Sequence, residues 1–150
     1  MKIYLASDHA GFELKELLRK WLVEQKYEVK DFGAFSFVEQ DDYSDFIKPL
    51  AKEISENPEN IKGIILGGSG QGEAMTANRF KNVRAVVYYG NKKEIIKLSR
   101  EHNNANILSL GARFLSEEEA REAVKLWLET SFSSEGKNER HLRRIKKIDQ

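Results

Sequence analysis

Cysteine is absent from the 150-residue sequence, and proline occurs only twice. The lack of cysteine excludes a disulfide framework, a thiolate metal site and a cysteine nucleophile or base. Long hydrophobic runs are missing as well. The first residues, MKIYLASDHA, lack the apolar stretch of a signal peptide, and no segment approaches a membrane-spanning length. We therefore expect a cytoplasmic protein that does not contact membranes.

The remaining composition is that of a folded protein. Hydrophobic residues make up 40% and charged residues 33%, and a chain of this length can bury a sizeable core, so we expect a single domain over residues 1–150. The net charge of +1 provides no global attraction to nucleic acid or to anionic lipid. Residues 137–147 differ from the rest, because they hold six basic residues against one acidic residue.

Apolar runs and helical patterns alternate along the chain. Five short, nearly continuous apolar runs are typical of strands buried on both faces of a parallel sheet. These runs are Ile3–Ala6, Tyr27–Val29, Ile64–Leu66, Val83–Tyr88 and Asn106–Leu110. The alternation predicts an α/β fold, a three-layer α/β/α sandwich in which helices cover both faces of a five-stranded parallel sheet.

Apolar stripes indicate where the main helices lie. Residues 14–22 and residues 120–128 each place apolar side chains at i, i+3, i+4, i+7 and i+8. The later stripe is preceded by Ser116 and Glu119, which have the spacing of a capping box. The stripe over residues 47–54 is weaker, and Pro49 is expected to delay the start of that helix or to kink it.

Loops that follow the strands are the places where such folds bind ligands. The segment Gly67–Gly72 follows a buried strand, opens a predicted helix over Ala74–Asn78, and has glycine at four of its six positions. Glycines let backbone N–H groups approach an anion closely, so we interpret the segment as an anion-binding loop. It lacks the Lys-Ser/Thr of a nucleotide phosphate loop, and a simple tight turn is the alternative interpretation.

Glu73 falls in the first turn of the predicted helix. A carboxylate there is common, because it complements the helix dipole. It is also suited to enolisation, in which a base removes a proton beside a carbonyl while fixed donors stabilise the oxyanion. Spacing alone leaves both interpretations open.

The three histidines occupy distinct places. His9 follows the first strand, His102 falls on the helical spacing of Ile95 and Leu98, and His141 lies in the basic segment. None is spaced from another as a pair of metal ligands, so we expect no metal site. A polar loop residue and a half-buried histidine are the simpler interpretations of His9 and His102.

The basic segment contains candidate phosphate ligands. Arg144 lies four residues after Arg140 and three after His141, so the three share one face of a predicted helix over residues 137–148. Arginine matches the geometry of phosphate oxygens, and Arg113, after the last strand, is a further candidate. A solvated basic terminus is the simpler interpretation.

An apolar strip accompanies these charges: Leu142, Ile145 and Ile148. A short helix with such a strip is unstable alone. We therefore expect this C-terminal helix to dock on another surface, such as a partner subunit.

Several segments together resemble the sugar-phosphate isomerase family that includes ribose-5-phosphate isomerase B and the galactose-6-phosphate isomerase subunits. The similarity runs from residue 2 to about residue 147. It is carried by motifs in the family's order: Ser7–Phe12, Asp42–Tyr43, Gly67–Glu73, Ala77–Arg79, Arg100–Asn106 and Arg140–His141. The resemblance implies a Rossmann-like homodimer with active sites at the subunit interface and no cofactor, with pairing into tetramers left open. It implies an aldose–ketose isomerase that interconverts ribose 5-phosphate and ribulose 5-phosphate through an enediolate.

The resemblance also implies chemical roles. Some family members use a cysteine base at the position of Gly67, and others a glutamate at the position of Glu73. Without cysteine, this chain resembles the glutamate branch. Glu73 would then move a proton between C2 and C1, while backbone N–H groups around Ser69, Gly70 and Gly72 hold the enediolate.

Further residues are implied to hold the sugar phosphate. His102 would assist opening of the furanose ring, and Asn103 would reach the sugar from the partner subunit. The other implied sugar contacts are Asp8, Tyr43, Gly67 and Gly68. The implied phosphate contacts, some of them across the dimer interface, are His9, Arg113, Arg140 and Arg144.

Two segments depart from the family's pattern. The usual Asp-Tyr-Pro reads Asp42-Tyr43-Ser44, and the connection Phe132–Lys137 before Arg140 is slightly longer than usual. A six-carbon substrate, such as allose or galactose 6-phosphate, is therefore the alternative within the enzyme class. A non-catalytic sugar-phosphate-binding module, in which Glu73 only caps a helix, is the alternative of another class. We expect no nucleic-acid binding, because only one short segment is basic.

Overall fold

The computed structural model describes residues 1–133 and 135–149. The strands of this part are β1 (Lys2–Ser7), β2 (Glu28–Asp31), β3 (Ile61–Gly67), β4 (Ala85–Tyr88) and β5 (Ile107–Gly111). The helices are α1 (Phe12–Glu24), α2 (Tyr43–Glu56), α3 (Gln71–Ala77), α4 (Glu94–Glu101), α5 (Glu117–Glu129) and α6 (Glu139–Ile148). A short 3₁₀ turn, η1 (Gly136–Asn138), precedes α6.

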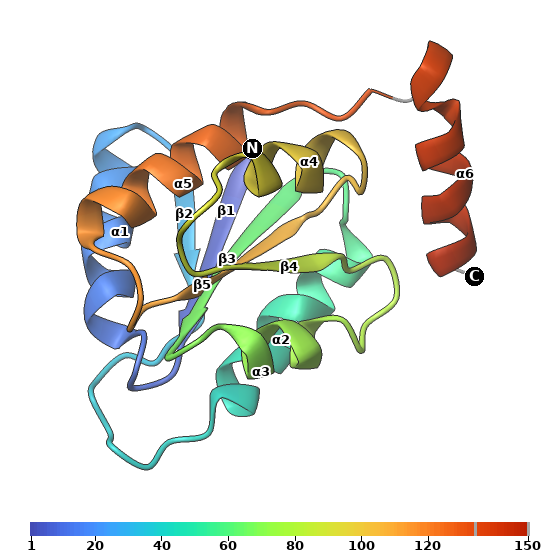
Figure 1. Ribbon diagram of the computed structural model, residues 1–150. Helices are drawn as coiled ribbons and strands as arrows, with labels where there is room; N and C mark the ends of the chain where they lie inside the picture. The colour runs from blue at the N-terminus through green and yellow to red at the C-terminus, as the bar shows by residue number, and fades with distance from the viewer. Residues whose placement is uncertain (134, 150) are drawn as a thin grey trace.

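The strands form one parallel sheet in the order β2-β1-β3-β5-β4. Helices α1, α4 and α5 cover one face of the sheet, and α2 and α3 cover the other (Figure 1). Each face has its own apolar core, one around Leu18, Leu66 and Trp127 and the other around Ile47, Leu50 and Ile65. The predicted α/β architecture with its five-stranded parallel sheet is confirmed.

Strand boundaries differ from the prediction at the edge of the sheet. The fourth predicted run begins at Val83, whereas β4 begins at Ala85. The backbone N–H of Arg84 donates to the Asn106 side chain at 2.8 Å instead of joining the ladder. A side-chain hydrogen bond therefore replaces the first rung of this edge strand.

Of the two local predictions for helix starts, one is confirmed and one is not. The capping box is confirmed, because Ser116 Oγ accepts from the N–H of Glu119 while the Glu119 carboxylate accepts from the N–H of Ser116. The expected delay at Pro49 is wrong, since α2 begins at Tyr43 and contains Pro49 in its interior, while the alternative, a kink, stays a prediction. Four fully buried apolar side chains hold this helix on the sheet despite the missing hydrogen bond: Ile47, Leu50, Ala51 and Ile54.

The strand order brings two predicted ligand-binding loops together. β1 and β3 are neighbours, but the chain runs from β1 to β2 on one side and from β3 to β4 on the other, with β5 between β3 and β4. In such sheets the crevice lies where the strand order reverses, outside the carboxyl ends of the strands. The segments Ser7–Gly11 and Gly67–Gly72 begin at those two ends.

Helix α6 stands apart from both helical layers (Figure 1). Its side chains His141 and Ile145 are buried, whereas Ile148 is 66% exposed. The apolar strip is therefore only partly covered by the chain's own residues. Within the described residues, no helix combines the length and apolar character needed to cross a membrane.

Candidate active site

The side chain of Glu73 is buried at the carboxyl end of β3. It projects from the first turn of α3 and is 4% exposed. A Cβ atom placed on Gly67 would lie 1.8 Å from Glu73 Oε1 and 2.4 Å from Oε2. The carboxylate therefore occupies the space that any side chain at position 67 would need.

The surroundings of Glu73 make it a stronger base than an exposed carboxylate. Burial raises the pKa of Glu73 above its ordinary value, and the nearby carboxylate of Asp8 raises it further. The backbone N–H of Glu73 itself acts in the opposite direction. A carboxylate of raised pKa takes up a proton from carbon more readily, as a general base must.

The glycine loop that precedes Glu73 is fixed through its carbonyl groups. Ser109 Oγ donates to the carbonyl of Gly70 at 2.6 Å, and the N–H groups of Ala112 and Arg113 donate to the carbonyls of Gly67 and Gly68. Gly70 adopts φ +77°, which favours glycine.

The N–H groups of the same loop remain available. Those of Ser69, Gly70 and Gly72 make no hydrogen bond to any of the residues described. Several free donors beside a buried carboxylate are the arrangement that stabilises a developing oxyanion.

Two side chains from other segments lie directly on this glycine loop. A Cβ atom on Gly72 would meet the Tyr43 hydroxyl oxygen at 2.7 Å, and one on Gly68 would meet the Arg113 guanidinium carbon at 3.2 Å. Tyr43 is the first residue of α2, and Arg113 follows β5. A phenol hydroxyl and a guanidinium therefore border the loop.

Asp8 and His9 lie at the end of β1, the strand beside β3 in the sheet. Asp8 is buried, and its Oδ1 accepts from the N–H groups of Ala10 and Gly11 at 3.0 and 3.3 Å. His9 is held by Asp41, whose Oδ1 lies 2.9 Å from the His9 backbone nitrogen and 2.7 Å from ring Nδ1. The two loops thus bring a carboxylate and an imidazole to the same edge as Glu73.

Asp41 is a residue that sequence reasoning missed. It lies 32 positions from His9, and no local pattern connects the two. Asp8, His9 and Asp41 also have ligand atoms within 4.8 Å of one another, a geometry that could hold a metal ion. The 2.7 Å distance between His9 and Asp41 is that of a direct hydrogen bond, and the absence of a metal stays a prediction.

A second group of predicted residues lies at the opposite end of the sheet, where the strands begin. His102 and Asn103 follow α4, just before β5, and Arg140 and Arg144 lie exposed on α6. His102 connects the loop after α4 to α6, because its ring stacks on that of His141 with centroids 4.2 Å apart. Ile95, on the same helical spacing, is 54% exposed, whereas Leu98 and His102 are half-buried.

His141 is a neutral platform for His102. Burial lowers the pKa of His141, and His102 and the arginines beside it lower it further. Arg140 Nε lies 3.5 Å from His141 Nε2, and a guanidinium can only donate, so this ring nitrogen acts as the acceptor.

The two groups lie at opposite ends of β5 and cannot meet within one chain. Gly67, beside Glu73, is paired with Gly111 at the end of β5, whereas Asn103 precedes its start. A strand rises about 3.3 Å per residue, so the ends of this five-residue strand lie roughly 15 Å apart. The chain brings Asp8, His9, Glu73 and Arg113 to one edge of the sheet but not His102.

Comparison with known proteins gives consistent matches over nearly the whole chain. A family model described as Ribose/Galactose Isomerase matches residues 3–148. Ribose-5-phosphate isomerase B of Mycolicibacterium paratuberculosis is 39% identical over 145 residues, which cover 97% of this chain and 87% of that protein. A probable ribose-5-phosphate isomerase B of Mycoplasma pneumoniae is 38% identical, with 97% and 91% covered.

Solved structures agree with these matches. The crystal structure of ribose-5-phosphate isomerase B from Mycoplasma genitalium with bound ribulose-5-phosphate has a TM-score of 0.91 and 36% identity, and the match covers 99% of this chain and 93% of that one. The isomerase B structure from Clostridium thermocellum has a TM-score of 0.89 at 37% identity, with 99% and 95% covered.

Substitution of Gly67 by alanine tests the position of the Glu73 carboxylate. The added Cβ overlaps that carboxylate, so we expect Gly67→Ala to lower the free energy of unfolding by about 1–3 kcal/mol. In a Glu73→Ala background the same change should cost much less, as urea unfolding of the four proteins would show. Gly68→Ala is the matched control, because the three atoms nearest to its Cβ all belong to the flexible Arg113 side chain, at 3.2–3.3 Å. Equal costs in both backgrounds would contradict the placement.

Proposed function

Because this chain belongs to the Ribose/Galactose Isomerase family, we propose that it interconverts ribose 5-phosphate and ribulose 5-phosphate through an enediolate, without a metal or a cofactor. The observation that carries the proposal is the buried Glu73 carboxylate beside the free N–H groups of the glycine loop. The named relatives, all ribose-5-phosphate isomerases B, support the same substrate. Phosphorylated sugars do not cross membranes unaided, so the proposal includes a cytoplasmic location.

Glu73 is the proposed base. In the open-chain aldose it removes the proton at C2, and the electron pair moves through C1 to leave a negative charge on the C1 oxygen. The same carboxyl group then returns the proton to C1, while the proton of the C2 hydroxyl passes to the C1 oxygen. C2 thereby becomes the ketone, and the C1 oxyanion becomes the C1 hydroxyl. The raised pKa of Glu73 supports both halves of this shuttle.

The glycine loop is the proposed oxyanion site. The N–H groups of Ser69, Gly70 and Gly72 would donate to the enediolate oxygens, and Gly67 and Gly68 leave room for the sugar to approach. Donors fixed before the reaction need no reorganisation when the charge develops. Loss of such a donor in other enzymes costs on the order of 10²–10³ in rate.

The remaining roles divide between two copies of the chain. Asp8 and Tyr43 would contact the sugar hydroxyls, and His9 and Arg113 would bind the phosphate from the same copy as Glu73. The second copy would supply Asn103 to the sugar, His102 for ring opening, and the phosphate ligands Arg140 and Arg144. A twofold dimer would contain two such sites, because each copy carries the group of Glu73 at one end of the sheet and the group of His102 at the other.

Exposed apolar side chains support this dimer. Phe37, Tyr89 and Phe114, all in loops at the edge that carries Glu73, are 63%, 52% and 63% exposed. The strip of α6 ends in the exposed Ile148. Large apolar side chains gathered at one edge are typical of surfaces that another protein covers. A tetramer would be a pair of such dimers.

Isomerisation of a six-carbon sugar phosphate is the second candidate, because the matched family is described for both ribose and galactose. An isomerase assay with ribose, allose and galactose phosphates, with a chelator present, tests the substrate. We expect the highest kcat/KM with ribose 5-phosphate. A higher value with a six-carbon sugar, or dependence on a metal, would overturn that part of the proposal.

Glu73→Gln should abolish the reaction while the protein stays folded. Glutamine keeps the size of the side chain but cannot accept the proton, so we expect kcat to fall by roughly 10²–10⁴. Exchange of the ribose 5-phosphate C2 proton with solvent, followed by NMR in D₂O, should fall equally. Glu16→Gln, on α1, is the control. Sugar-phosphate binding without any proton exchange by the unmodified protein would instead support a binding module.

The pH dependence of stability provides an independent test of the buried carboxyl group. The folded state holds the Glu73 proton more tightly than the unfolded chain, so this group stabilises the fold at low pH. That contribution is lost as the pH rises from the ordinary pKa of 4.5 through the raised value. Thermal melting should therefore show Glu73→Gln gaining stability relative to wild type as the pH rises from 4 to 8. A constant difference would contradict the raised pKa.

A mixture of two inactive variants should recover activity if the site is shared. In a heterodimer of Glu73→Gln and His102→Ala, one site carries both changes and the other carries neither. Random pairing makes half of the dimers mixed, so we expect about a quarter of wild-type activity. Co-refolding the two chains and assaying the mixture measures this. Activity no greater than that of the separate variants would contradict a shared site.

A further inference from the structure

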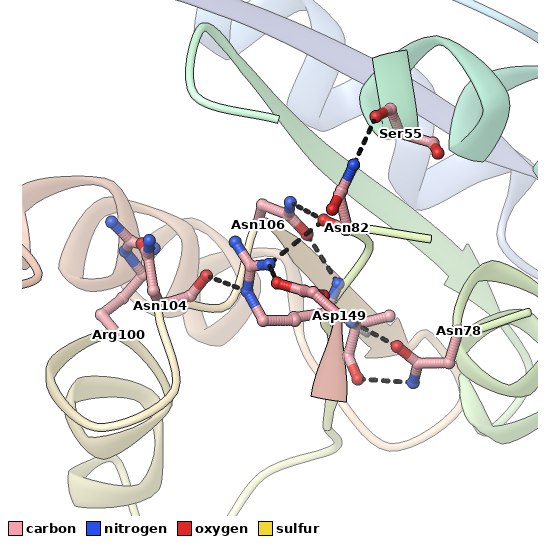
Figure 2. Close-up of polar contacts among 9 residues, drawn as sticks. Ser55, Asn78, Asn82, Arg100, Asn104, Asn106 and Asp149 are labelled. Carbon is pink, nitrogen blue, oxygen red and sulfur yellow. Dashed lines mark hydrogen bonds and ion pairs between the residues drawn. The ribbon is translucent and has the colours of Figure 1, made fainter. Parts of the chain in front are cut away.

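A polar network away from Glu73 connects the edge strand, the loop after α4 and the end of α6 (Figure 2). Its members come from segments far apart in the sequence, since Arg84 and Asp149 are 65 positions apart. The network lies at the edge of the sheet that carries His102 and Arg140.

Asn104 is the point where two arginines meet. Its side-chain oxygen accepts from Arg100 at 2.8 Å, and its backbone carbonyl accepts from Arg84 Nε at 3.0 Å. Its φ of +45° lies in the left-handed region, which fixes a sharp turn directly after Asn103. The two arginines therefore hold the loop that presents His102 and Asn103.

The same arginines reach the C-terminal segment. Arg100 donates to the carbonyl of Thr130 at 3.1 Å, where the chain leaves α5. Arg84 donates to Asp149 Oδ2 at 2.8 Å, directly after the last residue of α6. The C-terminal segment that carries Arg140 and Arg144 is thus hydrogen-bonded at both ends, at Thr130 and at Asp149, to the arginines that hold the loop of His102.

The ion pair of Arg84 with Asp149 is well sheltered. The side chains are 9% and 21% exposed, so solvent screens the pair less than an ordinary surface pair. Asp149 makes no other side-chain hydrogen bond within the described part of the chain. Arg84 keeps the carbonyls of Asn82 and Asn104 as acceptors, so removal of the Asp149 carboxylate leaves it partly satisfied.

Among the described residues, few other contacts orient α6. His141 stacks on His102, and Ile145 is buried, but Ile148 is exposed. These contacts fix the first and middle turns of the helix. The Asp149 carboxylate fixes the last turn, and with it the direction of the helix axis.

We propose that Arg84 and Asp149 are a positioning pair that sets the angle of α6, and thereby presents Arg140 and Arg144 together with His102 as one rigid unit. The inference rests on the proposed function, in which these arginines bind the phosphate of a sugar held by the second copy. Neither residue touches the substrate. The pair acts by preorganising groups that otherwise would have to be ordered when the substrate binds.

Substitutions of Asp149 test the pair, because Arg84 also holds the edge of the sheet and its loss would disturb folding. We expect Asp149→Ala to raise KM roughly three- to tenfold with kcat within about twofold of wild type, since binding geometry changes and the chemical step does not. Inhibition by inorganic phosphate should weaken by the same factor. Asp149→Asn retains a neutral acceptor for Arg84 and should lie between Asp149→Ala and wild type.

Glu122→Ala is the matched control. It removes an exposed ion pair with Lys93 that lies away from α6, and it should leave KM and phosphate inhibition unchanged. Melting temperature and size-exclusion elution should be the same for the Asp149 variants as for wild type. A fall in kcat, melting temperature or dimer content without a change in phosphate inhibition would show a merely structural role and overturn the inference.

Arg140→Ala separates this inference from the proposed function. If Arg140→Ala weakens phosphate inhibition and Asp149→Ala does not, the positioning pair is refuted while the phosphate site stands. If neither variant weakens phosphate inhibition, the assignment of α6 to the phosphate fails and the inference fails with it. Weakening by both, with kcat retained in Asp149→Ala, supports the pair.

Discussion

The contact between the Glu73 carboxylate and the α-carbon of Gly67 is the constraint around which the site is arranged. It requires a residue without a side chain at the end of β3, and it turns the carboxylate inward, where burial raises its pKa. A base at position 73 and a side chain at position 67 exclude each other for lack of space. The same lack of space would separate the two alternatives that the family resemblance implies, a cysteine base at the first position and a glutamate base at the second.

The rest of the site follows from the sheet. The reversal of strand order between β1 and β3 places the loop of Asp8 and His9 beside the glycine loop. Cationic side chains divide between the two edges, with Arg113 near Glu73 and Arg140 and Arg144 on α6. The separation is topological rather than accidental, because every helix in a parallel sheet returns its C-terminal end to the edge where the strands begin.

Signals contained in a few neighbouring residues could be read from the sequence, and contacts between distant residues could not. The capping box of Ser116 and the alternation of strands and helices are local, and both were predicted correctly. The delayed helix start predicted from Pro49 is wrong, because burial of the apolar face of α2 outweighs the local preference of proline. On α4, Ile95 is exposed while Arg100 is buried, a reversal that apolar periodicity does not register. The contact of Asp41 with His9 joins residues 32 positions apart, and that of Asp149 with Arg84 joins residues 65 apart.

The separation of the two groups by the length of β5 has a consequence for how catalytic activity depends on the concentration of the protein. If two copies must associate to complete a site, dilution below their dissociation constant removes the catalyst itself, not merely its stability. At low expression the number of complete sites rises with the square of the subunit concentration, and at high expression it rises linearly. A cell that halves its synthesis of this chain near that threshold would lose more than half of the flux.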